Sequence, residues 1–245
     1  HRYADAFDAG YREHYGGGQA LRDIEKIETL LADGGIAMTL YRPPEVPENR
    51  IRFKIFHPDR PIPLSDALPL FEHMGFRVMD EIPHDVGLRQ DQDQNRMVMI
   101  HDFGLESKDG ASVDLDSIRD KFQDAFVRVW RGEIESDGFN ALVPGAGLAW
   151  REVGILRAYA KYLRQAGTAF SQANMEQTLA GNAKITRRIV DLFKTLFDPA
   201  DHGKSAASRD ARAKQIRASI AKSLDAVVSA DEDRILRPFL NAVAS

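Results

Sequence analysis

The stretch IRFKIFHPDRPIPLSDALPLFEHMGFRV, residues 51–78, decides how the first part of this chain folds. Its first residues alternate between apolar and basic side chains, namely Ile51, Phe53 and Ile55 against Arg52 and Lys54. This period of two is typical of a strand with one buried face. Three prolines in residues 58–63 then prevent a helix until Ser65 can cap one. The stretch therefore predicts a strand, a stiff loop, a helix ending at Gly75 and a second strand.

The stiff loop is the first candidate binding site in the sequence. A rigid loop that leads into a helix N-terminus directs unpaired backbone N–H groups outward, where they can bind a small anion or an amino acid. Many such loops bind nothing. The sequence leaves both readings open at this point.

Composition excludes several classes of function. The chain has 245 residues, 43% of them hydrophobic, which suffices for two ordinary domains. Its net charge of -4 and isoelectric point near 6.0 argue against nucleic-acid binding. The absence of cysteine excludes thiol chemistry and thiolate metal sites, and it fits a reducing compartment. Because no apolar run is long enough to span a bilayer, we expect a cytoplasmic protein without a membrane partner.

The order of elements up to residue 131 predicts an α+β fold. Strand patterns occupy residues 36–41, 51–56, 76–82 and 96–105, the last apolar on both faces and so expected mid-sheet. Helical patterns occupy residues 20–31, 65–74 and 114–130, with Asp114 as the N-cap of the third. We expect a ferredoxin-like antiparallel sheet with two helices on one face, and a polar loop over residues 83–95.

The other face of this sheet is expected to be exposed. Its residues would be Arg52, Lys54, Phe56, Arg77, Met79 and Glu81. An RNA-recognition module on this fold needs two or three stacking aromatic rings there, and only Phe56 is aromatic. RNA binding is therefore not expected.

The character of the sequence changes after residue 131. We divide the chain into a helical lead-in (1–35), the α+β domain (36–131), a Gly/Pro-rich linker (132–147) and an all-helical bundle (148–245). Helical patterns fall at residues 148–166, 171–180, 183–197, 206–228 and from 231 onward. Residue 1 is His, and the last residues stop within an apolar periodic run, so we expect both ends to be cut from a longer polypeptide.

No catalytic, cofactor-binding or metal site can be assembled from the sequence. Gly145 and Gly147 resemble the opening of a dinucleotide fingerprint, but Trp150 stands where its third glycine belongs. His57 and His101 fall on strands that should be near neighbours, yet nothing supplies a third metal ligand. No nucleophile elbow or catalytic triad is present.

Two basic runs lie on the expected helices of the second part. Arg157, Lys161 and Arg164 share one stripe, which is either a solvated face or a docking site for an acidic partner domain or a phosphate group. The second run indicates a helix that faces either solvent or a partner. It consists of Arg209, Arg212, Lys214, Arg217 and Lys222.

Long motifs resemble those of the large bacterial NAD-dependent glutamate dehydrogenases. They are YREHY (11–15), LYRP (40–43), the stretch quoted above, IHDFGLE (100–106), DAFVRVWRGEIESDGFNALV (124–143) and GLAWREVGILRAYAKYLRQAG (147–167). In that family an ACT-like and helical N-terminal region precedes the catalytic region, which binds NAD. The resemblance implies that this chain is the noncatalytic N-terminal part, and that it binds no cofactor itself.

Residues 51–78 also resemble the opening of an ACT domain, whose Asp-Arg-Pro-Gly turn builds an amino-acid site, usually across a dimer. Asp59, Arg60 and Pro61 match that turn, whereas Ile62 replaces its glycine. A β-branched residue disfavours a positive φ and close backbone approach. Even with this departure at Ile62, the resemblance nominates Asp59, Arg60, Ile62 and Leu64 as effector-binding candidates.

The resemblance implies two functions of different kinds. One is a regulatory or scaffolding segment of an enzyme that deaminates L-glutamate to 2-oxoglutarate and ammonia with NAD. The other is an amino-acid sensor that binds its effector at a subunit interface. In both, the expected partners are other domains of the same polypeptide, in a homo-oligomer.

Overall fold

The structure, a computed structural model, describes residues 2–3, 5–88, 96–199 and 206–244. The chain divides into two compact units, His1–Glu135 and Ser136–Ser245. Each unit has its own hydrophobic core. No helix in the described part of the chain is both long enough and apolar enough to cross a membrane.

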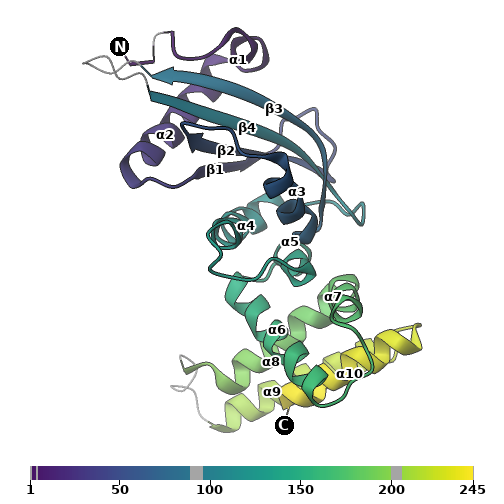
Figure 1. The fold of residues 1–245 in the computed structure, drawn as a ribbon. Coiled ribbons are helices and arrows are strands. Elements are labelled where there is room, and N and C mark those ends of the chain that lie inside the picture. Colours follow the sequence, from purple (N-terminus) through teal and green to yellow (C-terminus); the bar gives the residue numbers. More distant parts are fainter. Residues whose placement is uncertain (1, 4, 89–95, 200–205, 245) are drawn as a thin grey trace. The chain divides into compact units, whose positions relative to one another are not determined.

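The first unit is an antiparallel four-stranded sheet with helices on both faces (Figure 1). Its elements are α1 (Ala9–His14), α2 (Gly17–Asp33), β1 (Ala37–Tyr41), β2 (Arg50–Pro58), α3 (Leu64–His73), β3 (Phe76–Leu88), β4 (Arg96–Ser107) and α4 (Leu115–Trp130). The strand order is β1-β2-β4-β3. This confirms the predicted α+β class and the central position of the strand that begins at residue 96.

Helices α3 and α4 cover one face of the sheet through a cluster of phenylalanines. Phe53 on β2 meets Phe71, Phe122 and Phe126 at ring-centroid distances of 5.6, 5.4 and 4.9 Å. Such edge and tilted contacts add to the large apolar area that each ring buries. Asp114 caps α4 as predicted, because its Oδ1 accepts a hydrogen bond from the N–H of Ser117.

The opposite face of the sheet is covered as well, so the expectation of an exposed face was wrong. Lys54 and Phe56, predicted to be exposed, are both fully buried. Helices α1 and α2 pack there and form a second core. It includes Tyr11, Ile27, Leu30, Phe56, Val86, Val98 and Ile100. Of the other residues expected on this face, Arg77 and Met79 are exposed, but Glu81 points to the α3 side, where it contacts His101.

The buried stripe of α2 differs from the predicted one. The sequence pattern placed Leu21 on the apolar face, but this side chain is 66% exposed. The buried positions are Asp23, Ile27 and Leu30, spaced i, i+4 and i+7. Because the first of these positions is the charged residue Asp23, hydrophobicity alone does not reveal this buried stripe.

Strand β3 is longer than predicted. Residues 83–88 were expected to begin a polar loop, yet they pair with β4, and both Val86 and Leu88 are fully buried. Residues 89–95 of that expected loop lie outside the described part of the chain. The polar composition of residues 83–95 concealed two apolar residues that face the α1–α2 core.

Both outer strands carry features that hinder pairing with another sheet. On β3, Gly87 donates its N–H to the carbonyl of Ala6 at 2.9 Å, and Phe7 forms a bridge with Val86. The same strand has a bulge between Val78 and Asp80 and contains Pro83. β1 is only five residues long. Short strands, bulges and prolines are the usual protection of sheet edges.

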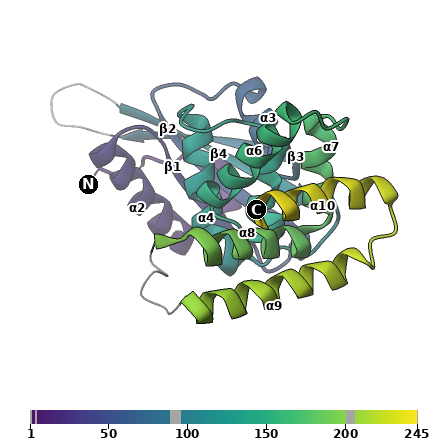
Figure 2. The same cartoon turned by 90° about the horizontal axis from the view of Figure 1, so that it is seen from below.

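The regular elements described in the second unit are all helices (Figure 2). Its elements are η1 (Gly138–Ala141), α5 (Leu142–Ala146), α6 (Trp150–Gln165), α7 (Gln172–Gly181), α8 (Ala183–Phe197), α9 (Ala206–Leu224) and α10 (Ala230–Ala244). Part of the stretch expected to be a linker belongs to this unit. Phe139, Leu142 and Val143 in it are buried, which the glycines around them obscured.

Candidate functional site

The loop of residues 58–63 lies between β2 and α3, as the sequence predicts. Its one residue with a positive φ is Asp59, at 66°. The N–H of Asp59 donates to the carbonyl of Met97 at 2.9 Å, which fixes the start of the loop on β4. Ile62, for which a positive φ would be costly, does not adopt one. The strain of the turn therefore falls on Asp59 instead.

Ile62 is held by a histidine from the centre of the sheet. Its side chain is only 4% exposed, and its N–H donates to Nε2 of His101 at 3.1 Å. Nδ1 of the same imidazole lies 2.8 Å from Glu81 Oε1. An acceptor at Nε2 and a donor at Nδ1 define the neutral ring with its hydrogen on Nδ1. The loop N–H that could have met a ligand is thus already paired.

The remaining loop candidates are exposed. Asp59 and Arg60 face solvent, and Leu64 is 45% exposed at the first position of α3. Helix α3 begins one residue earlier than predicted, with Pro63 as its N-cap. Ser65 was expected to be the cap, but its hydroxyl contacts Asp66 Oδ1 at 3.3 Å instead. The structure therefore brings the four candidates together where the loop meets the start of α3.

The densest polar cluster of the first unit lies elsewhere, beneath α1 and α2. Lys54 is fully buried, and its Nζ lies 2.6 Å from Asp23 Oδ2. The Tyr11 hydroxyl donates to that same oxygen at 2.6 Å, and Gln19 Nε2 donates to Oδ1 at 2.8 Å. The ammonium also sits 3.7 Å from the centroid of the Tyr15 ring. Its charge is therefore balanced by a carboxylate and by aromatic faces.

A second carboxylate, Asp102 on β4, collects the neighbouring donors. The hydroxyls of Tyr15 and Tyr41 both donate to its Oδ2, and Arg52 Nε donates to its Oδ1 at 2.9 Å. Arg52 also reaches Asp80 at 3.0 Å. Gly104 lies opposite Asp80, and a Cβ there would come within 2.5 Å of the Asp80 carboxylate. These contacts join α1, β1, β2, β3 and β4.

Burial shifts the proton affinities of this cluster. It lowers the pKa of Lys54, although Asp23 opposes that effect, and it raises the pKa values of Tyr11, Tyr15 and Tyr41 with help from the nearby carboxylates. Buried amines and paired carboxylates also occur in active sites. Here every polar atom of Lys54 and Asp23 is directed at a structural partner, which favours a packing role.

His84 stands beside the same cluster. It is 3% exposed, its ring meets Tyr11 and Tyr15 edge-on, and its Nδ1 lies 3.5 Å from Asp8 Oδ1. Its Nε2 is buried and has no hydrogen-bond partner within the described residues. Burial lowers the pKa of this imidazole more than Asp8 raises it. The site therefore favours the neutral ring.

The predicted basic stripe on α6 divides into two parts. Arg157 is 7% exposed and forms a paired contact with Asp137, at 2.7 Å from Nε and 2.8 Å from the terminal nitrogen, and it also reaches Asn140. Such a fork-shaped pair fixes α6 to η1. Lys161 and Arg164 remain exposed. Arg157 is thus engaged within its own unit, whereas docking by this stripe stays a prediction.

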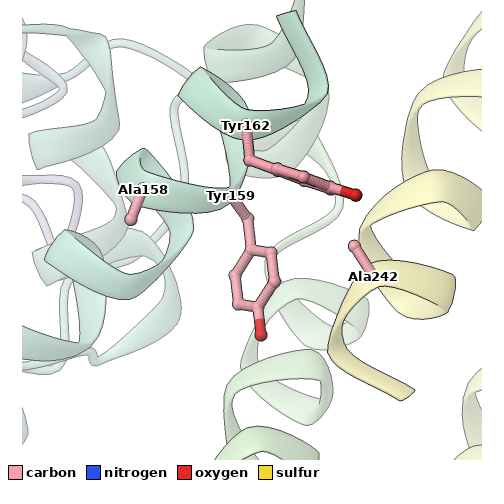
Figure 3. A pocket seen from close by; sticks show the side chains of 4 residues that line it. All are labelled: Ala158, Tyr159, Tyr162 and Ala242. Atoms are coloured by element: carbon pink, nitrogen blue, oxygen red, sulfur yellow. The ribbon is translucent and has the colours of Figure 1, made fainter. Parts of the chain in front are cut away.

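Aromatic side chains line two of the cavities on the described surface. One, of about 160 Å³, lies beside α1 and the start of α2, and it is lined by Tyr3, Phe7, Tyr11, Arg12 and Tyr15 among others. The other, of about 310 Å³, is lined by Ala158, Tyr159, Tyr162 and Ala242 (Figure 3). Among the described side chains that line the second cavity, the polar groups are the hydroxyls of Tyr159 and Tyr162. The described lining of the first cavity includes one acid, Asp5, besides the base Arg12.

The two histidines considered as metal ligands contact other groups of the chain. His57 contacts the carbonyl of Arg60, and His101 is engaged by Ile62 and Glu81. No group of three or more His, Asp or Glu side chains within the described ranges is arranged to hold a metal ion.

Three parts of the chain match known families. Residues 1–30 match "Glutamate dehydrogenase, helical motif 2", residues 35–118 match "Glutamate dehydrogenase, ACT3 domain", and residues 134–199 match "Glutamate dehydrogenase, helical motif 3". The ACT3 match spans the whole sheet and the start of α4. The chain belongs to the glutamate dehydrogenases that carry these domains. It is the segment of them that contains the third ACT domain and its flanking helical motifs.

Full-length relatives support this placement among the NAD-specific glutamate dehydrogenases. The chain is 38% identical over 242 residues to the enzyme of that name from Halomonas elongata, 35% identical to that of Pseudomonas aeruginosa and 37% identical to that of Mycobacterium tuberculosis. At least 98% of the chain aligns in each case, but it spans only about 14–15% of each relative.

The polar cluster under α1 and α2 escaped the sequence analysis. Lys54 alternates with apolar residues, as a solvent-facing residue of a strand does. Asp23 interrupts the apolar stripe of the helix. One signal was present in the sequence. Tyr11 and Tyr15 recur at helical spacing in the YREHY motif, which indicates that both rings pack on the same part of the protein.

Proposed function

We propose that this chain is a noncatalytic scaffolding segment of an NAD-specific glutamate dehydrogenase. The whole enzyme would convert L-glutamate to 2-oxoglutarate and ammonia by hydride transfer to NAD, with the cofactor and the reacting groups held outside this segment. Its partners would be other domains of the same polypeptide in a homo-oligomer, in the cytoplasm.

The proposal rests on one observation: the sheet faces and the loop N–H of the ACT domain are already in contact with other residues of this chain. Both faces of the sheet are covered, and the N–H of Ile62 is paired with His101. A sheet that is covered on both faces, beside a loop whose N–H is already paired, offers a rigid body for assembly. It presents little of the open, polar and concave surface that small ligands usually occupy.

Calorimetry tests this proposal on the isolated chain. Titration with NAD and with L-glutamate should give no binding heat, and a mixture of both should produce no NADH absorbance. Binding in the micromolar range, or glutamate-dependent NADH formation, would contradict it. A full-length enzyme under the same conditions serves as the positive control.

An amino-acid sensor is the second candidate, and the exposed guanidinium of Arg60 favours it. This side chain has no carboxylate partner within the described residues, so it could bind the carboxylate of an amino acid. A thermal-shift screen of the twenty amino acids tests this candidate. A stabilising amino acid whose effect disappears in Arg60→Ala supports sensing, and a screen without shifts leaves scaffolding.

A further inference from the structure

Helix α9 is the most basic element of an acidic chain. It carries Arg209, Arg212, Lys214, Arg217 and Lys222 against a single acid, Asp210, while the whole chain has a net charge of -4. Charge of this density on one exposed helix is either neutralised by neighbours or available to a partner.

The helix is anchored along one side only. Ala213, Ile220 and Leu224 are buried, and Arg217 donates to the carbonyl of Ala244 at 2.9 Å, which ties α9 to α10. Figure 2 shows α9 running beside α8 and α10. The exposed side carries three cations, at Arg212, Lys214 and Lys222. From residue 212 to residue 222 they extend over roughly 15 Å of helix.

These three cations lack the ion pairs that other basic residues of the second unit have. Arg237 pairs with Asp233 at 2.8 Å, and Lys194 pairs with Glu152 at 2.8 Å. Within the described ranges, no carboxylate lies within ion-pair distance of Arg212, Lys214 or Lys222, and none of the three side chains forms a hydrogen bond or a ring contact. Their charge is therefore available to another molecule or domain.

The chain itself contains the complementary chemistry. The first unit has 26 acidic and 17 basic residues, whereas the second has 11 acidic and 16 basic ones. An exposed row of acids, Asp116, Asp120 and Asp124, follows one side of α4 at a spacing of four residues. Asp116 and Asp124 lie 3.3 and 2.9 Å from arginines of the same helix, at exposed positions where such pairs are weak. Acidic surfaces of this kind are thus present in every copy of the enzyme.

We propose that the exposed side of α9 docks on an acidic protein surface within the assembled dehydrogenase. A membrane fits less well, because the apolar side of α9 is used in the bundle and Ala211 and Ala218 offer little to insert between lipids. Nucleic acid fits less well, because no aromatic side chain accompanies the cations on this helix. The alanines between the cations allow a protein partner to approach closely.

Zero-length carboxyl-to-amine cross-linking of the full-length enzyme tests the contact. Lys214 and Lys222 should link to Asp or Glu residues, and Arg212→Glu/Lys214→Glu/Lys222→Glu should weaken assembly at least tenfold at about 0.1 M salt, where surface charges still interact across about 10 Å. The charge-neutral variant Arg212→Gln/Lys214→Gln/Lys222→Gln should give a smaller loss. Lys184→Glu on α8 is the control for a single exposed cation and should leave assembly unchanged.

The inference rests on the proposed scaffolding function, but the two can fail separately. Binding of NAD by the isolated chain would overturn the function and leave the cross-links intact. Absence of cross-links from Lys214 and Lys222, with unchanged assembly of the triple variant, would overturn docking alone. Binding of the isolated chain to phosphatidylserine vesicles or to single-stranded nucleic acid at 0.15 M salt, lost in the triple variant, would also overturn it.

Discussion

Lys54 shows how one residue can hold together parts of the chain that lie far apart in sequence. Its ammonium pairs with Asp23 on α2 and lies against Tyr15, which follows α1. The sheet face under these helices therefore combines an apolar core with a buried ion pair. A buried pair need not be more stable than apolar residues of the same volume, but removing one partner alone is costly.

The first prediction is that Lys54→Met lowers the free energy of unfolding by about 3 to 5 kcal/mol, because Asp23 remains buried without its counterion. Urea unfolding followed by circular dichroism measures this change. Lys54→Met/Asp23→Asn should recover part of the loss, since the amide is neutral and can still accept from Tyr11. Lys108→Met, which breaks an exposed pair with Glu72, is the control and should change stability by less than about 0.5 kcal/mol. A double variant as unstable as Lys54→Met would refute this explanation.

The second prediction concerns pH and His84. Because burial lowers the pKa of this imidazole in the folded chain, the unfolded chain binds the proton first as the pH falls below about 6.5. The His84 contribution is therefore fully present above that pH and is lost below it. His84→Phe should flatten the fall in stability between about pH 6.5 and pH 5, measured by urea midpoints across that window. An unchanged slope would show that His84 does not titrate as its burial implies.

The sequence could not reveal these residue-scale partners. A period of two shows that Lys54 faces away from Phe53, but not whether that face meets water or another helix. The covering helices come from residues 9–33, and only their docked position makes the Lys54 face an interior one. Similarly, Ile62 could be recognised as a departure from the ACT turn, whereas its pairing with His101 depends on strand register.

At the scale of elements, apolar periodicity located most helices and strands. It failed where a polar group is buried, as on α2, and where buried apolar residues sit in a polar segment, as at the end of β3. It also missed α1, whose six residues are too short to show a helical period. Tertiary contacts with the sheet, rather than intrinsic propensity, stabilise such a short helix.

The third prediction compares two apolar residues of α2. Ile27 is fully buried against the sheet, whereas Leu21 is 66% exposed. Ile27→Ala should reduce stability by about 2 to 5 kcal/mol, the usual range for a buried aliphatic side chain. Leu21→Ala, a truncation of similar size on the same helix, should change it by no more than about 0.5 kcal/mol. Equal losses from the two variants would contradict the observed orientation of α2.

At the scale of the whole molecule, the chain consists of two units with opposite net charge and separate cores. The sequence indicated a boundary after residue 131, and the division of contacts falls between Glu135 and Ser136. Glycines marked the region of the change. They could not show that Phe139 and Leu142 already belong to the helical core, because that depends on packing against later helices.

The fourth prediction follows from the separate cores. Residues 1–135 and 136–245, expressed individually, should each unfold in a cooperative transition. Hydrogen exchange on the complete chain should then show that Ile27→Ala weakens protection in the first unit and leaves α6 and α8 unchanged. Loss of protection in both units to the same extent would mean that the chain unfolds as one cooperative body.

The closed ACT loop is the central claim, and the exchange rate of the Ile62 amide tests it most directly. Nuclear magnetic resonance of the isolated chain should show slow exchange for this amide, because it is buried and donates to His101. His101→Ala should accelerate exchange, and none of the twenty amino acids at millimolar concentration should alter the rate or the chemical shift in the wild type. A rapidly exchanging Ile62 amide, or one that becomes protected only when an amino acid is added, would contradict the claim and identify the loop as a sensor.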